Sequence, residues 1–580
     1  MINDLFAMVP PRVQCSLYAD DGSLWVSQPT PTEAINILQG ALQTIERWSQ
    51  QWGLTISAEK TTAIVFTRAR QTPDQQLILN GLNLQFVSQV RFLGVIFDQK
   101  LTWGSHIANL TSRCQADLRL LRVVAARRWG ADASTLQRLY VALIRSKLDY
   151  ASFLLSPAAA THLQKLDRIQ YEAARIILGA LRCTPVVKLE AEADLMPLNL
   201  RRQQILLMYC TRALTIPRHP ARLLLLNYHP YALYEHLARP LPAAGRAYQG
   251  FRKFQLKAQD IPTVPMQARY IPARIRTFAT LAVQHKEETS PEQWQQAFKD
   301  LLEHKYPLHH QVYTDGSVSD CKSGCGIYSP LFKIKAPLPP ATSVFSAELY
   351  AIYFAIKFAA EKMGKFVIFT DSLACIACLQ SANPSRHHLV PWIQNLLMTT
   401  IPNKFTLEWV PGHVGIKGNE AADRLAHASL ELAQITQMPY SSADVRRLIT
   451  HSFRSIWQRA WTEQPQELTS FKPILGPLTQ QSLPQPHQVT ITRLRLGVCL
   501  LTHGHHFSRS PPLQCTTCQS RLTLEHLFIS CPVLSPQRDQ LKSACARLSV
   551  PICLSSLMTP EFPAELIIKY LQATNMLNNI

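Results

Sequence analysis

Alternating apolar and polar runs between residues 311 and 426 predict one compact α/β domain. Val312-Tyr313-Thr314 is a β-branched and aromatic run followed by Asp315-Gly316-Ser317, a turn signal, so it predicts a strand with Asp315 at its far end. A helix is predicted next, because apolar residues recur at three- and four-residue steps at Ala351, Ala355, Phe358 and Ala359. Ser346 is a candidate N-cap, which would place Glu348 in the first turn of that helix.

Two further strands and a second helix complete this pattern. Residues 366–370 form an apolar run that ends in Asp371. Residues 405–410 predict the next strand, which leads into a glycine-flanked loop carrying His413. The segment from Asn419 to Ala426 predicts a helix that contains Asp423. Four carboxylates therefore fall at strand ends and helix starts of one domain.

The chemistry of these four acids depends on whether they converge. Taken singly, each is equally well explained as a solvated cap or strand-end residue. If they converge, their mutual repulsion raises some of their pKa values unless cations lie between them. Oxygen ligands without thiolates favour Mg²⁺ or Mn²⁺, and a pair of such ions can hold the attacking and leaving oxygens of a phosphodiester.

This stretch resembles type 1 ribonuclease H from end to end. The resemblance rests on five motifs, Tyr-Thr-Asp-Gly-Ser, Ser-Ala-Glu-Leu, Thr-Asp-Ser, Trp-Val-Pro-Gly-His-Val-Gly and Gly-Asn-Glu-Ala-Ala-Asp-Arg-Leu-Ala. It implies an active nuclease that cuts the RNA strand of an RNA–DNA hybrid. It also implies that two Mg²⁺ or Mn²⁺ ions are held by Asp315, Glu348, Asp371 and Asp423. His413 would assist proton transfer or product release.

Near the N-terminus, two apolar-rich arms flank Asp-Gly and predict a hairpin with Asp20 and Asp21 at its tip. The Asp-Gly pair alone explains a turn. Tyr-Ala-Asp-Asp after a hydrophobic strand also resembles the palm motif of reverse transcriptases, whose acids hold catalytic metal ions. Ser57–Thr61 and Phe92–Val95 resemble the lysine loop and the primer-grip hairpin of non-LTR retrotransposon enzymes.

That resemblance also implies an earlier strand with another metal-binding Asp, and fingers that carry the nucleotide pocket. Only 19 residues precede Asp20, too few for either. We therefore expect a truncated palm in which Asp20 and Asp21 are vestigial, and no RNA-directed DNA polymerase activity from this chain.

Residues 106–220 carry apolar positions at helical spacing and predict a mostly helical region. Lys and Arg exceed Asp and Glu by nine between residues 111 and 220. This surplus of positive charge is typical of an ordinary basic solvent face or of a groove that binds nucleic acid. Residues 163–179 resemble the thumb of the same retroelement enzymes, which favours the groove. Its candidate residues are Arg122, Arg127, Arg128, Arg145 and Lys147.

The last region contains a candidate zinc site. Cys515, Cys518, His526 and Cys531 have the spacing Cys-x2-Cys-x7-His-x4-Cys. Three thiolates and an imidazole in two close pairs suit tetrahedral Zn²⁺, although a chance match is the alternative. By resemblance to the tail of such retrotransposon proteins, this would be a zinc knuckle. Cys375 and Cys378 lie on a predicted helix with no second pair nearby and are interpreted as core.

Composition narrows the classes of partner and compartment. Lys and Arg exceed Asp and Glu by 20, which favours a polyanionic partner such as RNA or DNA over an anionic membrane. No apolar run is long enough to span a bilayer, and the N-terminus lacks a secretory signal pattern. The 14 scattered cysteines are typical of reduced thiols in the cytoplasm or nucleus.

We therefore predict a multidomain α/β protein that resembles the C-terminal part of a jockey- or I-like non-LTR retrotransposon polyprotein. The expected parts are a partial palm (α+β) at 1–105, a helical thumb at 106–220, a proline-rich linker at 221–308, a ribonuclease H domain with a mixed sheet at 309–436, and a zinc-containing region at 437–580. The leading function is RNA–DNA hybrid cleavage. The alternative is a non-catalytic remnant that binds nucleic acid.

Overall fold

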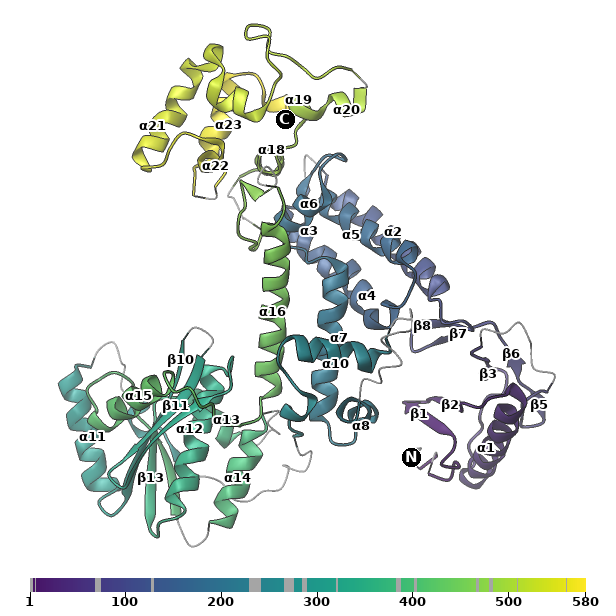
Figure 1. Ribbon diagram of the computed structural model, residues 1–580, viewed down its shortest axis with the longest axis vertical. Helices are drawn as coiled ribbons and strands as arrows, with labels where there is room; N and C mark the ends of the chain where they lie inside the picture. The colour runs from purple at the N-terminus through teal and green to yellow at the C-terminus, as the bar shows by residue number, and fades with distance from the viewer. Residues whose placement is uncertain are drawn as a thin grey trace. The chain divides into compact units, whose positions relative to one another are not determined.

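The chain forms two compact units (Figure 1). The computed structural model describes residues 4–5, 7–67, 75–126, 130–228, 241–264, 276–283, 289–319, 322–381, 387–400, 404–465, 469–478, 483–508, 510–559 and 561–580. Unit 1 consists of residues 1–198 and 470–580, and unit 2 consists of residues 199–469. Unit 2 is therefore an insertion in the sequence of unit 1.

Unit 2 is built around a six-stranded mixed sheet with the order β12-β11-β10-β13-β14-β9. The strands β10, β11 and β12 are antiparallel neighbours, whereas β13, β14 and β9 continue the sheet in parallel to β10. The predicted mixed sheet is thus confirmed. Its strands are β9 (Arg276–Phe278), β10 (His310–Ser319), β11 (Lys322–Ser329), β12 (Phe332–Leu338), β13 (Lys365–Thr370) and β14 (Lys404–Trp409).

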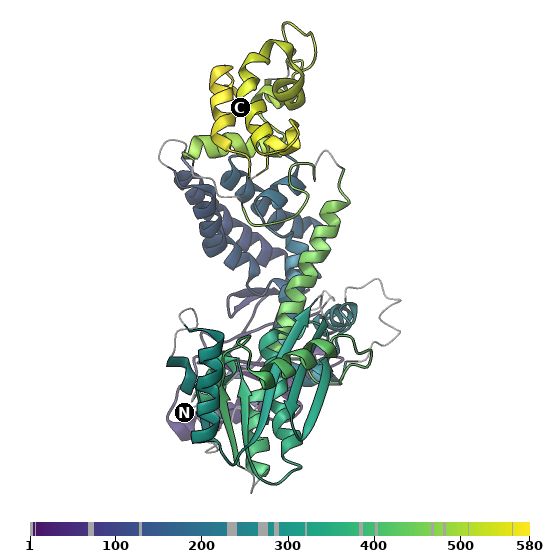
Figure 2. The same cartoon turned by 90° about the vertical axis from the view of Figure 1, so that its left-hand side faces the viewer.

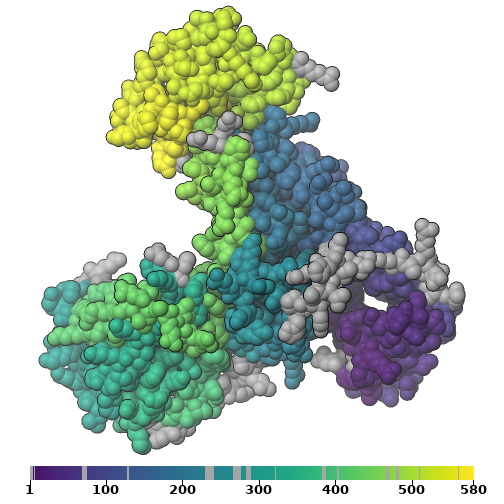
Figure 3. Space-filling view, in the orientation of Figure 1, coloured from purple at the N-terminus to yellow at the C-terminus, as the bar shows by residue number. Residues whose placement is uncertain are grey.

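Helices cover both faces of this sheet (Figures 1 and 2). On one face, Phe298 of α11 (Pro291–Lys305) packs on the rings of Tyr313 and Phe369, and α15 (Lys417–Ser429) lies over β11. On the other face, α12 (Val344–Ala359) begins against Gly316 and also contacts α13 (Leu373–Gln380) and α14 (Leu389–Thr399). In Figure 3 this part of the chain is the lobe coloured from teal to green.

Part of the segment expected to be a linker belongs to this core. The strand β9 pairs with β14, and α11 buries Trp294, Phe298 and Leu301 against the sheet. The recurring prolines suggest a linker, but the proline of α11 stands at the first position of the helix, where proline is tolerated. Because α11 is only 15 residues long, its helical periodicity is short. Other described helices of unit 2 are α7 (Leu198–Thr215), α8 (Pro220–Leu226), α10 (Ala243–Lys253) and α16 (Ser442–Thr462).

The N-terminal part of unit 1 contains short antiparallel hairpins packed near a long helix, α1 (Pro31–Trp52). The predicted hairpin is confirmed as β1 (Gln14–Tyr18) and β2 (Asp21–Trp25), but its two-residue turn is Ala19-Asp20 and not Asp21-Gly22. Ala19 adopts a positive φ of 54°, and Gly22 pairs with Leu17 inside the ladder. The remaining strands are β3 (Thr62–Ala63), β4 (Ile78–Leu79), β5 (Leu82–Asn83), β6 (Gln85–Phe86), β7 (Gln89–Phe92) and β8 (Val95–Asp98).

Helices follow the last hairpin, as predicted for the thumb-like region. They are α2 (Gly104–Val124), α3 (Ala133–Tyr140), α4 (Ser146–Asp149), α5 (Ala160–Leu178) and α6 (Val186–Glu192). A hydrophobic core between them contains Leu110, Leu118, Leu166 and Ile177, and it is completed by Leu496 from the distant C-terminal region.

The helix α18 (Gln485–Leu496) joins the C-terminal region to these helices. Arg493 donates to the carbonyl oxygen of Gly179 at 2.8 Å, and Lys188 donates to that of Leu496 at 2.8 Å. Glu192 forms a buried ion pair with Arg495 at 3.3 Å. The rest of this region is α19 (Leu500–His503), α20 (His505–Ser508), α21 (Asp539–Arg547), α22 (Leu554–Leu557) and α23 (Ala564–Ala573).

Within the described part of the chain, no helix combines the length and apolar character that crossing a membrane requires.

Candidate functional site

Asp315 lies in the middle of the longest strand of the sheet, and the prediction that it ends the strand is wrong. The strand β10 continues to Ser319, and Asp315 pairs with Gly326 of β11. The presumed turn residue Gly316 has a tertiary role. A Cβ there would lie 2.7 Å from the backbone nitrogen of Glu348, so the absence of a side chain lets α12 approach the strand.

Glu348 lies near the start of α12, which places it beside Asp315. The N-cap of this helix is Ser343, whose hydroxyl accepts a hydrogen bond from the backbone N–H of Ser346. The predicted cap at Ser346 is therefore wrong, and Glu348 follows the first turn instead of lying in it. Ser346 is buried and its hydroxyl serves another contact, a 2.6 Å hydrogen bond to Asp444.

Asp371 follows directly after β13, as predicted. Its backbone carbonyl oxygen accepts a hydrogen bond of 3.0 Å from the indole N–H of Trp409, on the neighbouring strand β14. A Cβ on Gly412 would lie 2.4 Å from Oδ2 of Asp371, so the loop after β14 lies against this carboxylate. The strand end and that loop therefore fix Asp371 from two sides.

Three of the four predicted acids converge. One carboxylate oxygen from each of Asp315, Glu348 and Asp371 lies within 4.8 Å of the others. Asp423 projects from α15, and its carboxyl group interacts with that of Asp315. The side chains thus come from a strand, the strand beside it and one helix on each face of the sheet.

Burial and like charge both disfavour ionisation in this cluster. Desolvation, followed by the charges of Asp371 and Asp423, raises the pKa of Asp315 to about 7. Desolvation and the charges of Asp315 and Asp371 raise the pKa of Glu348 well above its ordinary value. Desolvation also raises the pKa of Asp371, against an opposing hydrogen bond from Asn419 and the nearby charge of His413.

One carboxylate oxygen of this cluster is buried without a hydrogen-bond donor in the part of the chain that the structure describes. Oε2 of Glu348 is buried and has no hydrogen-bond partner among the described residues. A buried acceptor without a donor is costly, and an acidic cluster is relieved by a cation. The donor set, carboxylate oxygens without sulfur, fits a divalent metal ion.

His413 is exposed on an otherwise largely buried loop between β14 and α15, and it adopts a positive φ of 60°. Gly415 has a φ of 84°, and Gln295 of α11 donates to the carbonyl oxygen of Val414 at 3.3 Å. A Cβ on Gly415 would lie 2.2 Å from Nε2 of Gln295, so the loop is closely packed on α11.

Two residues that contact Asp371 are not among the predicted site residues. Asn419 is buried and hydrogen-bonds Asp371, and Trp409 holds the Asp371 backbone. Asn419 stands in the Gly-Asn-Glu-Ala-Ala-Asp motif, four residues before Asp423 and so on the same face of α15. That spacing is the signal that could have identified it.

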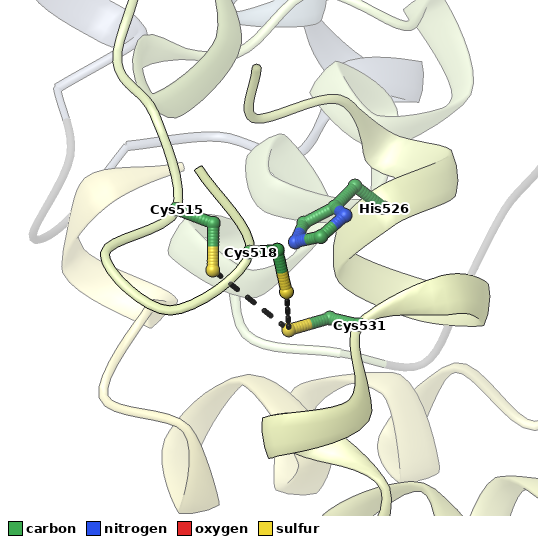
Figure 4. Close-up of side chains that lie close together, drawn as sticks. All are labelled: Cys515, Cys518, His526 and Cys531. Atoms are coloured by element: carbon green, nitrogen blue, oxygen red, sulfur yellow. Dashed lines mark hydrogen bonds between the residues drawn. The ribbon is translucent and has the colours of Figure 1, made fainter. Parts of the chain in front are cut away.

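The four predicted zinc ligands form a second cluster, shown in Figure 4. The sulfur of Cys531 lies 4.0 Å from that of Cys515 and 3.9 Å from that of Cys518. A tetrahedral zinc ion with Zn–S bonds of about 2.3 Å separates its sulfur ligands by about 3.8 Å. Nε2 of His526 is buried without a partner among the described residues, while its Nδ1 lies 3.2 Å from the hydroxyl of Ser520.

Local hydrogen bonds favour a thiolate in this cluster. Hydrogen bonding by the backbone N–H of Cys518 is the largest cause that lowers the pKa of Cys515 to about 6. Desolvation and the neighbouring sulfurs raise the pKa of Cys518 to about 11. The thiolate of Cys515 is therefore favoured, whereas Cys518 favours its thiol form. Arg538 is buried and donates to the carbonyl oxygen of Cys531 at 2.5 Å.

The other predicted site residues belong to the β1–β2 hairpin and to the helical region 106–220. Asp20 and Asp21 are exposed at the β1–β2 turn. Arg122 is paired with Glu172, and Lys147 is paired with Asp117 at 2.6 Å. Arg145 is partly buried, and Arg127 and Arg128 lie outside the described residues.

Comparison with protein families identifies two segments. Residues 308–431 match the RNase H family, and residues 1–97 match the reverse transcriptase (RNA-dependent DNA polymerase) family. The first segment contains all four acids and His413. The second contains the β1–β2 hairpin.

Similar proteins come from insect mobile elements. The chain is 28% identical over 179 residues to an RNA-directed DNA polymerase from mobile element jockey of Drosophila funebris, a match that covers 31% of this chain and 19% of the relative. It is 29% identical over 169 residues to a probable RNA-directed DNA polymerase from transposon BS of Drosophila melanogaster, covering 29% and 19%. A Pol polyprotein from the type-1 element R1 of Bradysia coprophila is 24% identical over 149 residues, covering 26% and 15%.

Each match thus spans about a fifth or less of the relative's length. The relatives are named as RNA-directed DNA polymerases of mobile elements or, for R1, as a Pol polyprotein of a retrotransposable element. Residues 308–431 form an RNase H domain, in a chain that also carries a reverse transcriptase segment and a Cys/His cluster that fits a zinc knuckle.

Proposed function

We propose that this protein cuts the RNA strand of RNA–DNA hybrids at the site formed by Asp315, Glu348, Asp371 and Asp423. The observation that carries the proposal is the convergence of Asp315, Glu348 and Asp371 within an RNase H domain, where burial and like charge make a bound cation favourable. We assign the activity to residues 309–436 together with the helix α11 that packs on them.

The four acids are the residues that would hold the metal. Two Mg²⁺ or Mn²⁺ ions bound there would activate a water molecule and stabilise the leaving 3′-oxygen of the RNA strand. The unpaired Oε2 of Glu348 supports this assignment, because it is a buried ligand atom without another use among the described residues.

The remaining side chains orient this set and move protons. Asn419 and Trp409 hold Asp371 by its carboxylate and its backbone. His413 is exposed beside them, where its imidazole can exchange a proton with the leaving group or with solvent as the product departs. Gln295 and Gly415 keep this loop in place.

Asp371→Asn tests the proposal, because it removes a full negative charge with little change in size. Hybrid cleavage by the full chain with Mg²⁺ should collapse by about 100-fold or more, while hybrid binding persists. Asp300→Asn is a matched control, since Asp300 is an exposed carboxylate on α11 of the same unit. A variant at Asp371 that cuts as well as the parent would refute the site, and a parent chain that binds hybrid without cutting it would favour the non-catalytic alternative.

We also propose that Cys515, Cys518, His526 and Cys531 hold one structural Zn²⁺, supported by the sulfur separations and the free Nε2 of His526. For the basic helical region, we propose contacts with RNA or DNA backbones through Arg145 together with Arg122, Arg127, Arg128 and Lys147. The ion pairs of Arg122 and Lys147 with acids mean that phosphates must compete with Glu172 and Asp117 there.

A further inference from the structure

Asp444 joins two helices of unit 2 through its carboxylate. It is the third residue of α16, and only 2% of its surface is exposed. Oδ2 accepts hydrogen bonds from the hydroxyl groups of Ser441, at 2.7 Å, and Ser346, at 2.6 Å. Oδ1 accepts one from the backbone N–H of Ser343 at 3.0 Å. One bond is thus local to α16, and the other two reach the first residues of α12, about 100 positions earlier.

The carboxylate of Asp444 is held by hydrogen bonds and not by a salt bridge among the described residues. No Lys or Arg forms an ion pair with it in the part of the chain that the structure describes. Its carboxylate instead lies at the N-termini of both α12 and α16, where helix dipoles stabilise negative charge. His387 contacts Ser346 with Nε2 at 3.0 Å, but burial lowers its pKa to about 4, so it is neutral at pH 7.

A second contact fastens the same helix pair. Arg447, one turn along α16 from Asp444, donates from Nη2 to the carbonyl oxygen of Ala341 at 2.6 Å. Ala341 lies just before the N-cap of α12. The start of α16 therefore binds the start of α12 through two side chains, the carboxylate of Asp444 and the guanidinium of Arg447.

The start of α12 is packed tightly against the strand that carries Asp315. Ser346 and Glu348 are two residues apart on one helix, so they move together. Gly316 of β10 is already so close that an added Cβ would lie 2.7 Å from the backbone nitrogen of Glu348. A small shift of the first turn of α12 would therefore change the separation between the Glu348 and Asp315 carboxylates directly.

We propose that Asp444 is a positioning residue for hybrid cleavage: by anchoring the N-terminus of α12, it sets the place of Glu348 relative to Asp315 and Asp371. This inference rests on the proposed ribonuclease H function. Asp444 lies outside the segment 308–431 that matches the RNase H family, so α16 adds a support that the matched domain does not contain.

Three single variants of the full chain separate positioning from general stability. Asp444→Asn removes the charge, and Ser346→Ala removes one of the two hydrogen bonds between Asp444 and the start of α12, the one from the Ser346 hydroxyl. Ser441→Ala is the matched control, because it removes the α16 cap and one bond to Asp444 while leaving both contacts with α12. A labelled hybrid is used at saturating concentration across a Mg²⁺ series.

We expect Asp444→Asn and Ser346→Ala to lower kcat about tenfold and to raise the Mg²⁺ concentration for half-maximal rate, with KM for hybrid unchanged. The double variant should be no slower than the slower single one, because both changes break the same link. Ser441→Ala should cut at the parental rate. Amide hydrogen exchange should rise in residues 344–350 in the first two variants only.

The outcomes are distinguishable from failure of the proposed function. If the parent does not cut hybrid, the function fails before Asp444 is tested. If the parent cuts and Asp371→Asn does not, parental kcat and Mg²⁺ dependence in Asp444→Asn overturn the positioning role. Should Asp444→Asn not fold, Ser346→Ala decides, since it leaves α16 intact, and a parental rate there overturns the proposal. Equal losses in Ser441→Ala also overturn it, because they would reduce Asp444 to a cap of α16.

Discussion

Asp315→Asn should make the metal-free protein more stable at neutral and alkaline pH while abolishing cleavage. The substitution keeps the size of the side chain and removes a charge that is 8% exposed and lies close to Glu348 and Asp371. Buried acids of like charge lower the free energy of unfolding when no metal ion lies between them. The prediction therefore separates what the acids do for catalysis from what they cost in stability.

The magnitude follows from the raised pKa. Asp315 has an ordinary pKa of 3.8 and a folded-state pKa of about 7. In this window the folded chain binds more protons than the unfolded chain, so the free energy of unfolding falls as pH rises from about 4 to about 7. At 1.36 kcal/mol per unit, the loss is on the order of 4 kcal/mol above pH 7. The Asn variant lacks this loss, so its advantage should be small near pH 4 and largest near pH 8.

Hydrogen exchange of peptides from β10 and β13, in EDTA and at pH 5 and pH 8, reports the local free energy of opening after correction for intrinsic rates. Mg²⁺ should then stabilise the parent more than the variant, since only the parent retains the full set of ligands. Asp300→Asn, on the exposed side of α11, should follow the parent. If Asp315→Asn loses as much stability between pH 5 and pH 8 as the parent does, the carboxylates do not repel one another as inferred.

Three further predictions address other parts of the fold. Cys518→Ser should release one bound Zn²⁺ in a metal assay and increase hydrogen exchange in residues 510–531, while cleavage of short hybrids persists; a reduced, folded parent without zinc would contradict the assignment. Gly326→Ala should destabilise unit 2 by about 1–3 kcal/mol or more and impair cleavage, because its Cβ would lie 2.2 Å from backbone atoms of α15, the helix that carries Asp423; unchanged thermal unfolding would be inconsistent with this packing. Glu192→Gln should destabilise unit 1 by roughly 3–5 kcal/mol, because Arg495 is left buried without its counter-charge, and denaturant titration would show no such loss if the ion pair is dispensable.

The elements that carry the acids could be predicted because local pattern and tertiary role coincide there. The strand before Asp371 is an apolar run buried on both faces, and α12 shows helical periodicity. The same agreement holds for the Cys/His cluster, whose ligands lie within 17 residues of each other. Short sequence separation makes such a site visible without a fold.

Errors arose where a distant partner overrides the local signal. Asp315-Gly316-Ser317 has the composition of a turn, but Gly316 is required by the approach of α12 and the strand continues through it. Ser346 looks like a cap, yet its hydroxyl bonds to Asp444, 98 residues later. The short pattern of α11 predicts a linker, whereas its place in the core depends on rings of β10 and β13. None of these contacts can be read from local periodicity.

The interrupted sequence of unit 1 imposes an order on its synthesis. Leu496 completes the core between α2 and α6, and Arg493 bonds to Gly179, but the 271 residues of unit 2 are translated between the two halves. At about 5–20 residues per second, the ribosome needs roughly 15–55 s to cross that insertion. Throughout this interval the nascent helices of the first half expose the surface that α18 will later cover, while unit 2 has time to fold. The first half of unit 1 is thus made before unit 2, and its core can be completed only after unit 2 has been made.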